Sequence, residues 1–436
     1  MPLKLKSVMR VPRSIGYAGI IVLVAALAMV ATLPGRTHGL GMITERLLAD
    51  ESLGLSRTNF SDMNLWATLL GGLFCLPCGW LIDRFGLRIT LTVTVASLAA
   101  VVLAMTQLSG WWPLFGAIVL TRGFGQSALS VISITMVAKW FSRSRLSLAM
   151  AVYSLLLSLG FAWAAQIAKP WREDDWRVVW GGMGWILAAF ALLAWMVTRD
   201  PSPSEVVQEE SEEDNAARAQ ENAPSFTLVE AMRTQAFWVF GITISLIALI
   251  GSGLSLFNES VLKEQGFSAE VFYNLITWIG IVGLVVKLPI GWLGQYVALN
   301  RLLAAGLLLQ AICLIALPRI QTTGAVTAYG AGMGVGGTIT TVLFFTIWGQ
   351  AFGRKHVGQI QGVAQMLTVL ASAAGPKVLA ECYARYNSYA PAFEWLAMAL
   401  GVLTFWALMI RMPQAQAVPQ IEPISVLVAS PGRAET

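Results

Sequence analysis

The chain has 436 residues, of which 56% are hydrophobic and 12% are charged, and its mean hydropathy is +0.67. Soluble domains carry about twice that share of charged residues, so the composition excludes a soluble globular protein and indicates an integral membrane protein. The net charge of +5 does not indicate a nucleic-acid partner, because a bias of basic residues toward the loops on one side of a membrane accounts for it.

Uncharged apolar runs that are long enough to cross a bilayer recur along the whole chain. In the first half they are Ile15–Gly35, Met63–Ile82, Ile89–Thr121, a further span ending at Ala138, Leu146–Ala168 and Val178–Thr198. In the second half they are Thr234–Asn258, Val271–Val286, Leu302–Pro318, Ile320–Gly353, Val357–Pro376 and Trp395–Ile410. The sequence therefore predicts an all-α integral membrane protein with twelve transmembrane helices that lie within the lipid bilayer.

The orientation follows from the loops that hold Lys and Arg. One set of alternate loops carries most of them, including Arg84, Arg88 and Lys139, together with the basic N-terminal segment. These loops are expected to face the cytoplasm, which places both termini there and the protein in the cell (inner) membrane as a multi-pass protein. The first apolar run follows basic residues as in a signal peptide, but it is long enough to span, so we expect an uncleaved first helix.

The two halves of the chain repeat one another at a near-constant offset. The segment Gly54–Phe60 matches Gly266–Phe272, and Pro77–Leu81 matches Pro289–Leu293. Each half holds six spans, and an even number of crossings makes the two copies parallel. Two parallel six-helix repeats around a site at the bilayer midplane are typical of a transporter.

These boundaries predict four regions. Residues 1–198 form the N-terminal six-helix half, 199–231 a disordered cytoplasmic linker, 232–412 the C-terminal six-helix half and 413–436 a disordered cytoplasmic tail. The linker is acidic and lacks aromatic residues in its middle, and the tail is rich in Pro, Ala and Gln. We expect a monomer.

The loop after the second predicted helix carries the most specific motif of the chain, GWLIDRFGLR, which begins at Gly79. It resembles the G-x-L-x-D-R-x-G-R signature of the major facilitator superfamily. The resemblance implies the twelve-helix fold of that family and a conformational latch between the halves on the cytoplasmic side. Its residues here are Gly79, Asp83, Arg84, Gly86 and Arg88. Gln295 stands in the second copy where the first has Asp83.

Other stretches resemble the monocarboxylate porter and oxalate–formate antiporter-like branch of that family. They are LPGRTHG, LLADESLGLSR, Lys139-Trp-Phe, Phe352-Gly-Arg-Lys-His and Gly375-Pro376. Related carriers more often show PGQTFG at the first of these. The resemblance implies a small organic anion as substrate, and it implies that basic residues on the eighth and eleventh helices bind that anion.

The fourth predicted helix carries a polar stripe formed by Arg122, Gln126, Ser130 and Ser133. Arg122 falls near the bilayer midplane, where the free energy of exposing a charged guanidinium to lipid is too unfavourable. This face should therefore meet a wet cavity or a partner. A substrate role and a structural role for Arg122 both remain open. The repeat aligns Ser127 and Ser130 of this helix with Thr338 and Thr341 of the tenth helix.

Three further basic residues are candidates for binding the anion. Arg36 follows a Pro34-Gly35 break in the first helix, and its planar guanidinium suits a carboxylate. Lys287 lies in the eighth helix, where it could instead snorkel toward the interface, and Lys377 follows the Gly375-Pro376 pair in the eleventh. The candidates for proton coupling are His38, Glu259 and Asp62.

The sequence thus predicts a secondary active transporter of a small organic anion, a carboxylate, that works by alternating access and in symport with a proton. An exporter of hydrophobic compounds and a transporter-like nutrient sensor are the alternatives. The sequence shows no metal-ligand cluster, no cofactor site and no nucleophile–base pair, so we do not expect an enzyme.

Overall fold

The computed structural model describes residues 13–36, 39–40, 43–55, 57–141, 143–167, 175–202 and 225–410. Within these ranges the chain is helical and contains no strand, and 11 of its helical stretches are long and apolar enough to cross a membrane. One stretch, Asp62–Met105, is 44 residues long, which is about twice the length that a bilayer requires. This stretch contains two spans, so the predicted fold class of twelve transmembrane helices is confirmed.

The helices of the first half come from residues 13–202. They are α1 (Arg13–Val30), η1 (Leu33–Gly35), α3 (Thr44–Ala49), η2 (Glu51–Leu53), α4 (Arg57–Gly72), α5 (Cys75–Met105), α6 (Trp111–Thr121), the π-helical segment η3 (Arg122–Leu129), α7 (Ser130–Trp140), α8 (Arg143–Ile167) and α9 (Trp176–Val197). The helices of the second half come from residues 225–410. They are α12 (Leu228–Met232), α13 (Gln235–Glu264), α14 (Ala269–Tyr296), α15 (Leu299–Ala316), η5 (Leu317–Arg319), α16 (Thr323–Phe352), α17 (Val357–Tyr386) and α18 (Ala390–Met409).

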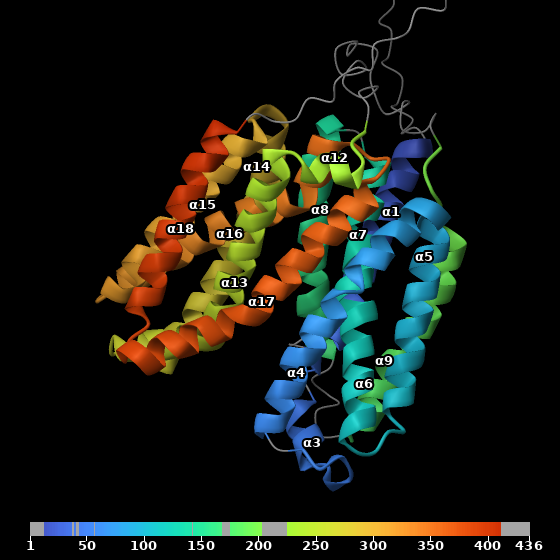
Figure 1. The fold of residues 1–436 in the computed structure, drawn as a ribbon, viewed down its shortest axis with the longest axis horizontal. Helices are drawn as coiled ribbons and strands as arrows, with labels where there is room; N and C mark the ends of the chain where they lie inside the picture. The colour runs from blue at the N-terminus through green and yellow to red at the C-terminus, as the bar shows by residue number, and fades with distance from the viewer. Residues whose placement is uncertain are drawn as a thin grey trace, which may run out of the picture.

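Figure 1 shows the two groups of helices side by side, with the first half in blue to green and the second half in yellow to red. The halves meet at the end of the bundle that holds α12 and the start of α17, and they diverge toward the end that holds α3. We call the first of these the linker end, because residues 202 and 225, which flank the linker, lie there. The predicted disorder of the tail, and of residues 203–224 of the linker, concerns residues outside the described ranges, whereas the described end of the linker contains the start of α12.

Two breaks determine how the second and third spans connect. Gly86 lies inside α5 with φ 81° and ψ 174°, a backbone conformation that an L residue with a side chain rarely adopts. The chain therefore leaves the second span at Gly86 and begins the third span at Leu87. The apolar run Ile89–Thr121 is also divided, because α5 ends at Met105 and α6 begins at Trp111.

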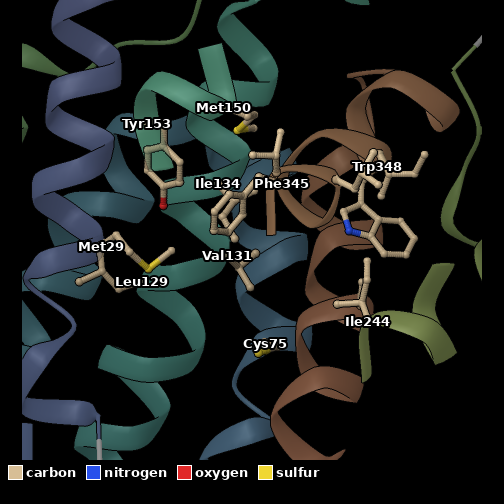
Figure 2. Close-up of a cluster of buried hydrophobic side chains, with 14 of the residues drawn as sticks. Met29, Cys75, Leu129, Val131, Ile134, Met150, Tyr153, Ile244, Phe345 and Trp348 are labelled. Atoms are coloured by element: carbon tan, nitrogen blue, oxygen red, sulfur yellow. The ribbon is translucent and has the colours of Figure 1, made fainter. Parts of the chain in front are cut away.

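An apolar layer joins the halves near the linker end. Figure 2 shows Ile134, Val131 and Met150 of the first half beside Phe345 of the second half. The rings of Tyr153 and Phe345 meet edge to face, with centroids 5.2 Å apart, and Tyr153 is fully buried. Burial of this layer stabilises the arrangement in which the linker end is closed.

Candidate functional site

Arg36 lies at the break that ends the first span. Pro34 is the second residue of the short helix η1, and Arg36 follows this helix in an extended conformation, with φ −102° and ψ 152°. Gly35 lies directly against η3, since a Cβ atom there would stand 2.2 Å from the carbonyl oxygen of Thr121. This close approach fixes the backbone next to Arg36, and it explains why the sequence has a glycine at this position.

The guanidinium of Arg36 turns back along α1 and contacts neutral groups among the described residues. Its Nε donates to Thr32 Oγ1 at 2.6 Å, and its Nη2 donates to Met29 Sδ at 3.0 Å and to Ser130 Oγ at 3.1 Å. The carbon at its centre stands 5.5 Å from the ring centroid of Phe161 on α8. Within the described residues, Arg36 forms no ion pair with a carboxylate. Its positive charge is therefore held by hydroxyls, a sulfur and a ring.

Arg122 joins three segments of the first half. It is 2% exposed, and its Nη1 donates to the carbonyl of Gly35 at 3.0 Å and to Gln126 Oε1 at 2.8 Å, while Nη2 donates to Asn64 Oδ1 at 3.1 Å. These bonds connect η1, η3 and α4. Of the two roles that the sequence left open, this geometry favours a structural role for Arg122, and Gln126 serves as one of its acceptors.

The rest of the polar stripe also faces α1. Ser130 accepts the hydrogen bond from Arg36, and Ser133 donates to the carbonyl of Ala25 at 2.6 Å. The hydroxyl of Ser133 lies 2.7 Å from that of Tyr153 on α8. These serines therefore hold α1 against α7 and α8. The sequence allowed either a wet cavity or a partner at this face, and the structure shows a partner, helix α1.

Lys287 crosses from the second half to the first. Its Nζ on α14 donates to the hydroxyl of Ser158 on α8, so the side chain does not snorkel along its own helix. Ser158 and Phe161 are three residues apart on α8 and lie on the same helix face. Arg36 and Lys287, which come from opposite halves, thus approach neighbouring turns of one helix.

The other predicted binding residues lie elsewhere. The hydroxyl of Thr338 donates to Gly334 at 2.8 Å and to Gly283 at 3.3 Å, and that of Thr341 donates to Gly337 at 2.7 Å. The hydrogen atoms of both hydroxyls are therefore used by backbone carbonyls of α16 and α14. Lys377 is exposed and lines a hollow between α17 and α18 with Glu381 and Trp395. The structure does not bring Lys377 together with Arg36.

The proton-coupling candidates are only partly visible. Asp62 is exposed and lines a hollow of 490 Å³ with Asn59, Trp111 and Trp112 at the end of the molecule opposite the linker end. His38 and the side chain of Glu259 lie outside the described residues. Within the described ranges, no group of three or more His, Cys, Asp or Glu side chains is arranged to hold a metal ion.

The motif loop contacts the second half at the linker end. Asp83 accepts a hydrogen bond from the backbone N–H of Gln359 at 3.0 Å, in the first turn of α17, and forms an ion pair with Lys139 at 3.2 Å. Gly79 allows this approach, because a Cβ atom there would stand 2.4 Å from the carbonyl oxygen of Gly358. We use "the latch" for Gly79, Asp83 and the first turn of α17.

The remaining motif residues act within the first half. Arg84 stacks on Trp80 and Phe85, at 5.4 and 5.8 Å from the ring centroids. Arg88 donates to the carbonyl of Trp195 at 2.7 Å and lies 4.3 Å from its ring. Arg88 therefore fixes the start of the third span to the end of α9.

A second anchor lies at the opposite end, between the loop after the first span and α9. Asp50 accepts hydrogen bonds from Ser52, from Trp176 Nε1 at 3.0 Å and from Arg177 Nη1. Burial by itself would raise the pKa of the Asp50 carboxyl, but these donors outweigh it and lower the pKa to about 2. The carboxylate thus stays ionised and holds this loop on α9.

Sequence reasoning missed three residues of the site: Ser158, Phe161 and Asn64. Ser158 and Phe161 lie in a helix that has no charged residue beyond Arg145, so its sequence gives no sign of a charged partner and only the approach of Arg36 and Lys287 marks them. Asn64 could have been found, because it is a polar residue inside an apolar run with a basic residue on a neighbouring helix.

Comparisons with solved structures agree with the observed fold. The human organic anion transporter MFSD10 (TETRAN) is 16% identical with a TM-score of 0.66, over 91% of this chain and 100% of that one. The proton:xylose symporter XylE is 14% identical with a TM-score of 0.68, over 92% and 97%. The E. coli fucose:proton symporter FucP is 14% identical with a TM-score of 0.61, over 90% and 98%. At these identities the likeness shows the fold alone.

The family follows from the sequence itself. No curated protein matches the chain. The sequence profile described as Major Facilitator Superfamily, however, matches residues 15–376, which is most of the chain. The chain therefore belongs to the major facilitator superfamily and is a multi-pass membrane transporter.

Proposed function

We propose that this transporter carries a small organic anion, a carboxylate, which binds between Arg36 of the first half and Lys287 of the second. One observation carries the proposal: two cations from opposite halves approach neighbouring turns of α8, and neither forms an ion pair with a described carboxylate. The resemblance to the monocarboxylate and oxalate–formate branch supports an anion as cargo and a basic residue of the eighth helix, Lys287, as one of its ligands.

The electrostatics favour an anion at this position. Two unit charges about 8 Å apart repel by about 2 kcal/mol at an effective dielectric constant near 20, and a carboxylate between them would remove that repulsion. The guanidinium fork can also donate two parallel hydrogen bonds to a carboxylate. Since each half supplies one cation, a bound anion would draw the halves together, as alternating access requires.

The test is binding and uptake by purified protein in detergent and in proteoliposomes. Mono- and dicarboxylates should raise the melting temperature of the parent protein, whereas sugars and amines should not. Arg36→Gln and Lys287→Gln should each weaken carboxylate binding at least about tenfold, because a charged contact to the ligand is lost. The double variant should lose less than the sum, since both residues serve one ligand.

Arg385→Gln is the control, because Arg385 is exposed and forms an ion pair with Glu381 on its own helix. It should keep parental binding. Unchanged carboxylate binding in both Arg36→Gln and Lys287→Gln would contradict the proposal. Stabilisation of the parent by a sugar or an amine in place of every carboxylate would contradict it too.

Proton symport is the second part of the proposal. The candidate residues for proton coupling are Asp62, whose carboxylate is exposed, Glu259 and His38. In proteoliposomes, an imposed pH gradient, acidic on the outside, should drive accumulation of the carboxylate. Uptake that follows an opposing anion gradient and ignores the pH gradient would instead indicate exchange.

A second candidate function, export of hydrophobic compounds, rests on a different observation. An apolar groove of about 320 Å³ lies between α1, α8 and α9, and its lining includes Leu27, Trp163 and Ile186. If apolar compounds are the cargo, Ala164→Phe should block their binding in this groove, and Ala162→Phe, which alters the exposed face of the same helix, should not.

A further inference from the structure

The start of the linker is bound to the motif loop. Asp200 lies just beyond the end of α9, and both of its carboxylate oxygens accept from the backbone N–H of Leu87, at 3.1 and 3.0 Å. Leu87 is the first residue of the third span after the kink at Gly86. A Cβ atom at Gly86 would stand 2.4 Å from Asp200 Oδ2, so the carboxylate fits directly against the glycine.

This contact is a helix cap supplied from another segment of the chain. The first N–H groups of a helix have no partner within the helix, and a carboxylate there stabilises both the free donor and the positive end of the helix dipole. Asp83 does the same for α17 at Gln359. The loop between the second and third spans therefore gives one cap, from Asp83 to the second half, and receives one, from Asp200.

The end of the linker is bound in the same way to the loop before α17. Phe226 donates its backbone N–H to the carbonyl of Phe352 at 2.9 Å, and the two rings meet at 5.7 Å. Gly353 has φ 83° and ψ 178°, nearly the angles of Gly86, and a Cβ atom there would stand 2.5 Å from Ser225 Oγ. A capping box at Thr227 then begins α12.

Both anchored loops adjoin the latch. Gly86 is three residues from Asp83, and Gly353 is four residues before the first helical residue of α17, whose first turn Asp83 caps. Arg354, next to Gly353, also reaches the first half and donates to the carbonyl of Phe141 at 3.2 Å. The first and last described residues of the linker thus contact the two loops that meet when the linker end of the molecule closes.

We propose that Asp200 and Phe226 are positioning residues of the latch: each fixes one of its two loops, so that the ends of the linker set the balance between the closed and open linker end. Each anchor lies within one half and can persist when the halves separate. Each loop then stays in the conformation that re-forms the Asp83–Gln359 contact, and a smaller entropic cost favours closure.

The test measures how often the linker end opens, with a cysteine reporter at Ser147. Ser147 is 1% exposed and lies between the halves, where it donates to the carbonyl of Gly294 at 3.2 Å. In the Ser147→Cys background, Asp200→Ala and Phe226→Ala should each speed maleimide labelling. Asp200→Ala should do so about fivefold, the factor that corresponds to loss of one helix cap. Asp200→Asn should have a smaller effect, because its amide oxygen can still accept from Leu87.

Asp83→Ala is the positive control, and Glu394→Ala is the negative control, since Glu394 lies on α18 at the other end in an exposed pair with Arg319. Melting temperatures of all variants separate opening from loss of the fold. If Asp200→Ala lowers the melting temperature and leaves labelling unchanged while Asp83→Ala speeds labelling, Asp200 is merely structural and the proposal fails. Faster labelling in only one of the variants Asp200→Ala and Phe226→Ala overturns the proposal that both linker residues position the latch. If Asp200→Ala does not fold, the labelling rate of Asp200→Asn provides the test.

Discussion

Asp50 shows how a single carboxylate can hold a loop at the end of the molecule opposite the linker end. It accepts hydrogen bonds from Ser52, Trp176 and Arg177, and Arg177 also stacks on Trp176 at 4.5 Å. The loop that follows Arg36 is thereby fixed to α9. A contact of this kind contributes about 1 kcal/mol when partly buried.

The first prediction concerns the pH dependence of this anchor. The pKa of Asp50 is about 2 in the folded protein and about 3.9 in an unfolded chain. Because the folded value is lower, the anchor stabilises the protein fully above about pH 4 and is lost as the pH falls toward 2. Asp50→Asn should lower the melting temperature by about 2–4 °C at pH 6, and this difference should shrink at pH 3.

Glu51→Gln is the matched control, because Glu51 is the neighbouring residue and is exposed. It should leave the melting temperature within about 1 °C of the parent value. A difference between Asp50→Asn and the parent that stays constant from pH 6 to pH 3 would show that the charge of Asp50 does not stabilise the loop.

Residue identity located the break beside Arg36 but not the residues that approach this arginine. Arg36 was found from the sequence as a charge beside a Pro34-Gly35 break, and the structure shows that break. The predicted partner on the eleventh helix, Lys377, lies in a different hollow, and Lys287 approaches the same helix as Arg36. Which face of a helix meets the other half depends on the rotation of that helix in the bundle, and an apolar sequence does not encode it clearly.

At the scale of helices, the crossing of α5 and α17 depends on an absent side chain. Gly79 faces the backbone of Gly358 and Gln359, and a Cβ atom would approach them to 2.4 and 2.9 Å. Backbone atoms cannot shift as the end of a side chain can, so a methyl group must push the helices apart.

The second prediction follows from this contact. Gly79→Ala should increase labelling of the Ser147→Cys reporter severalfold and slow transport, because the linker end can no longer close fully. Gly116→Ala is the matched control, since a Cβ atom at Gly116 meets nothing within 4 Å. It should be neutral or slightly stabilising, as alanine favours a helix more than glycine does. Equal labelling of the two variants would argue against the close contact at Gly79.

The sequence predicted the helices better than their internal geometry. Helical spacing places Arg122, Gln126 and Ser130 on one face, and the structure turns this face toward η1 and the residue that follows it, Arg36. The π-helical segment η3 that holds Arg122 was not predicted, because an apolar helical pattern does not distinguish π-helical from α-helical hydrogen bonds. The repeat did survive at this scale: α4 begins at Arg57 and α14 at Ala269, positions that the repeat aligns.

At the scale of the whole molecule, the two halves contact each other mainly at the linker end. The contact between α8 and α14 is close, since a Cβ atom at Gly291 would stand 2.2 Å from Cβ of Ala151 and one at Gly294 would stand 3.1 Å from Cβ of Ser147. Rocking of the halves, which alternating access requires, must open this contact.

The third prediction tests that motion. The double variant Ser147→Cys, Gly294→Cys should form a disulfide under mild oxidation, because its Cβ atoms lie near the usual separation. Oxidation should abolish transport, and a reductant should restore it. The two single variants should transport equally under both conditions. Full transport by the crosslinked protein would show that the α8–α14 contact need not open.

The sequence by itself determined the membrane class, the twelve spans, the repeat and the motif loop. These features depend on the length, polarity and order of local segments, because the thickness of the hydrocarbon core requires apolar helices of a given length. The tertiary structure decided which charges face one another: Lys287 rather than Lys377 approaches the helix that Arg36 contacts, and Asp200, outside every predicted span, caps the third one. Such pairings depend on how helices rotate and cross, and small residues such as Gly79 and Gly35 set those contacts through the absence of a side chain.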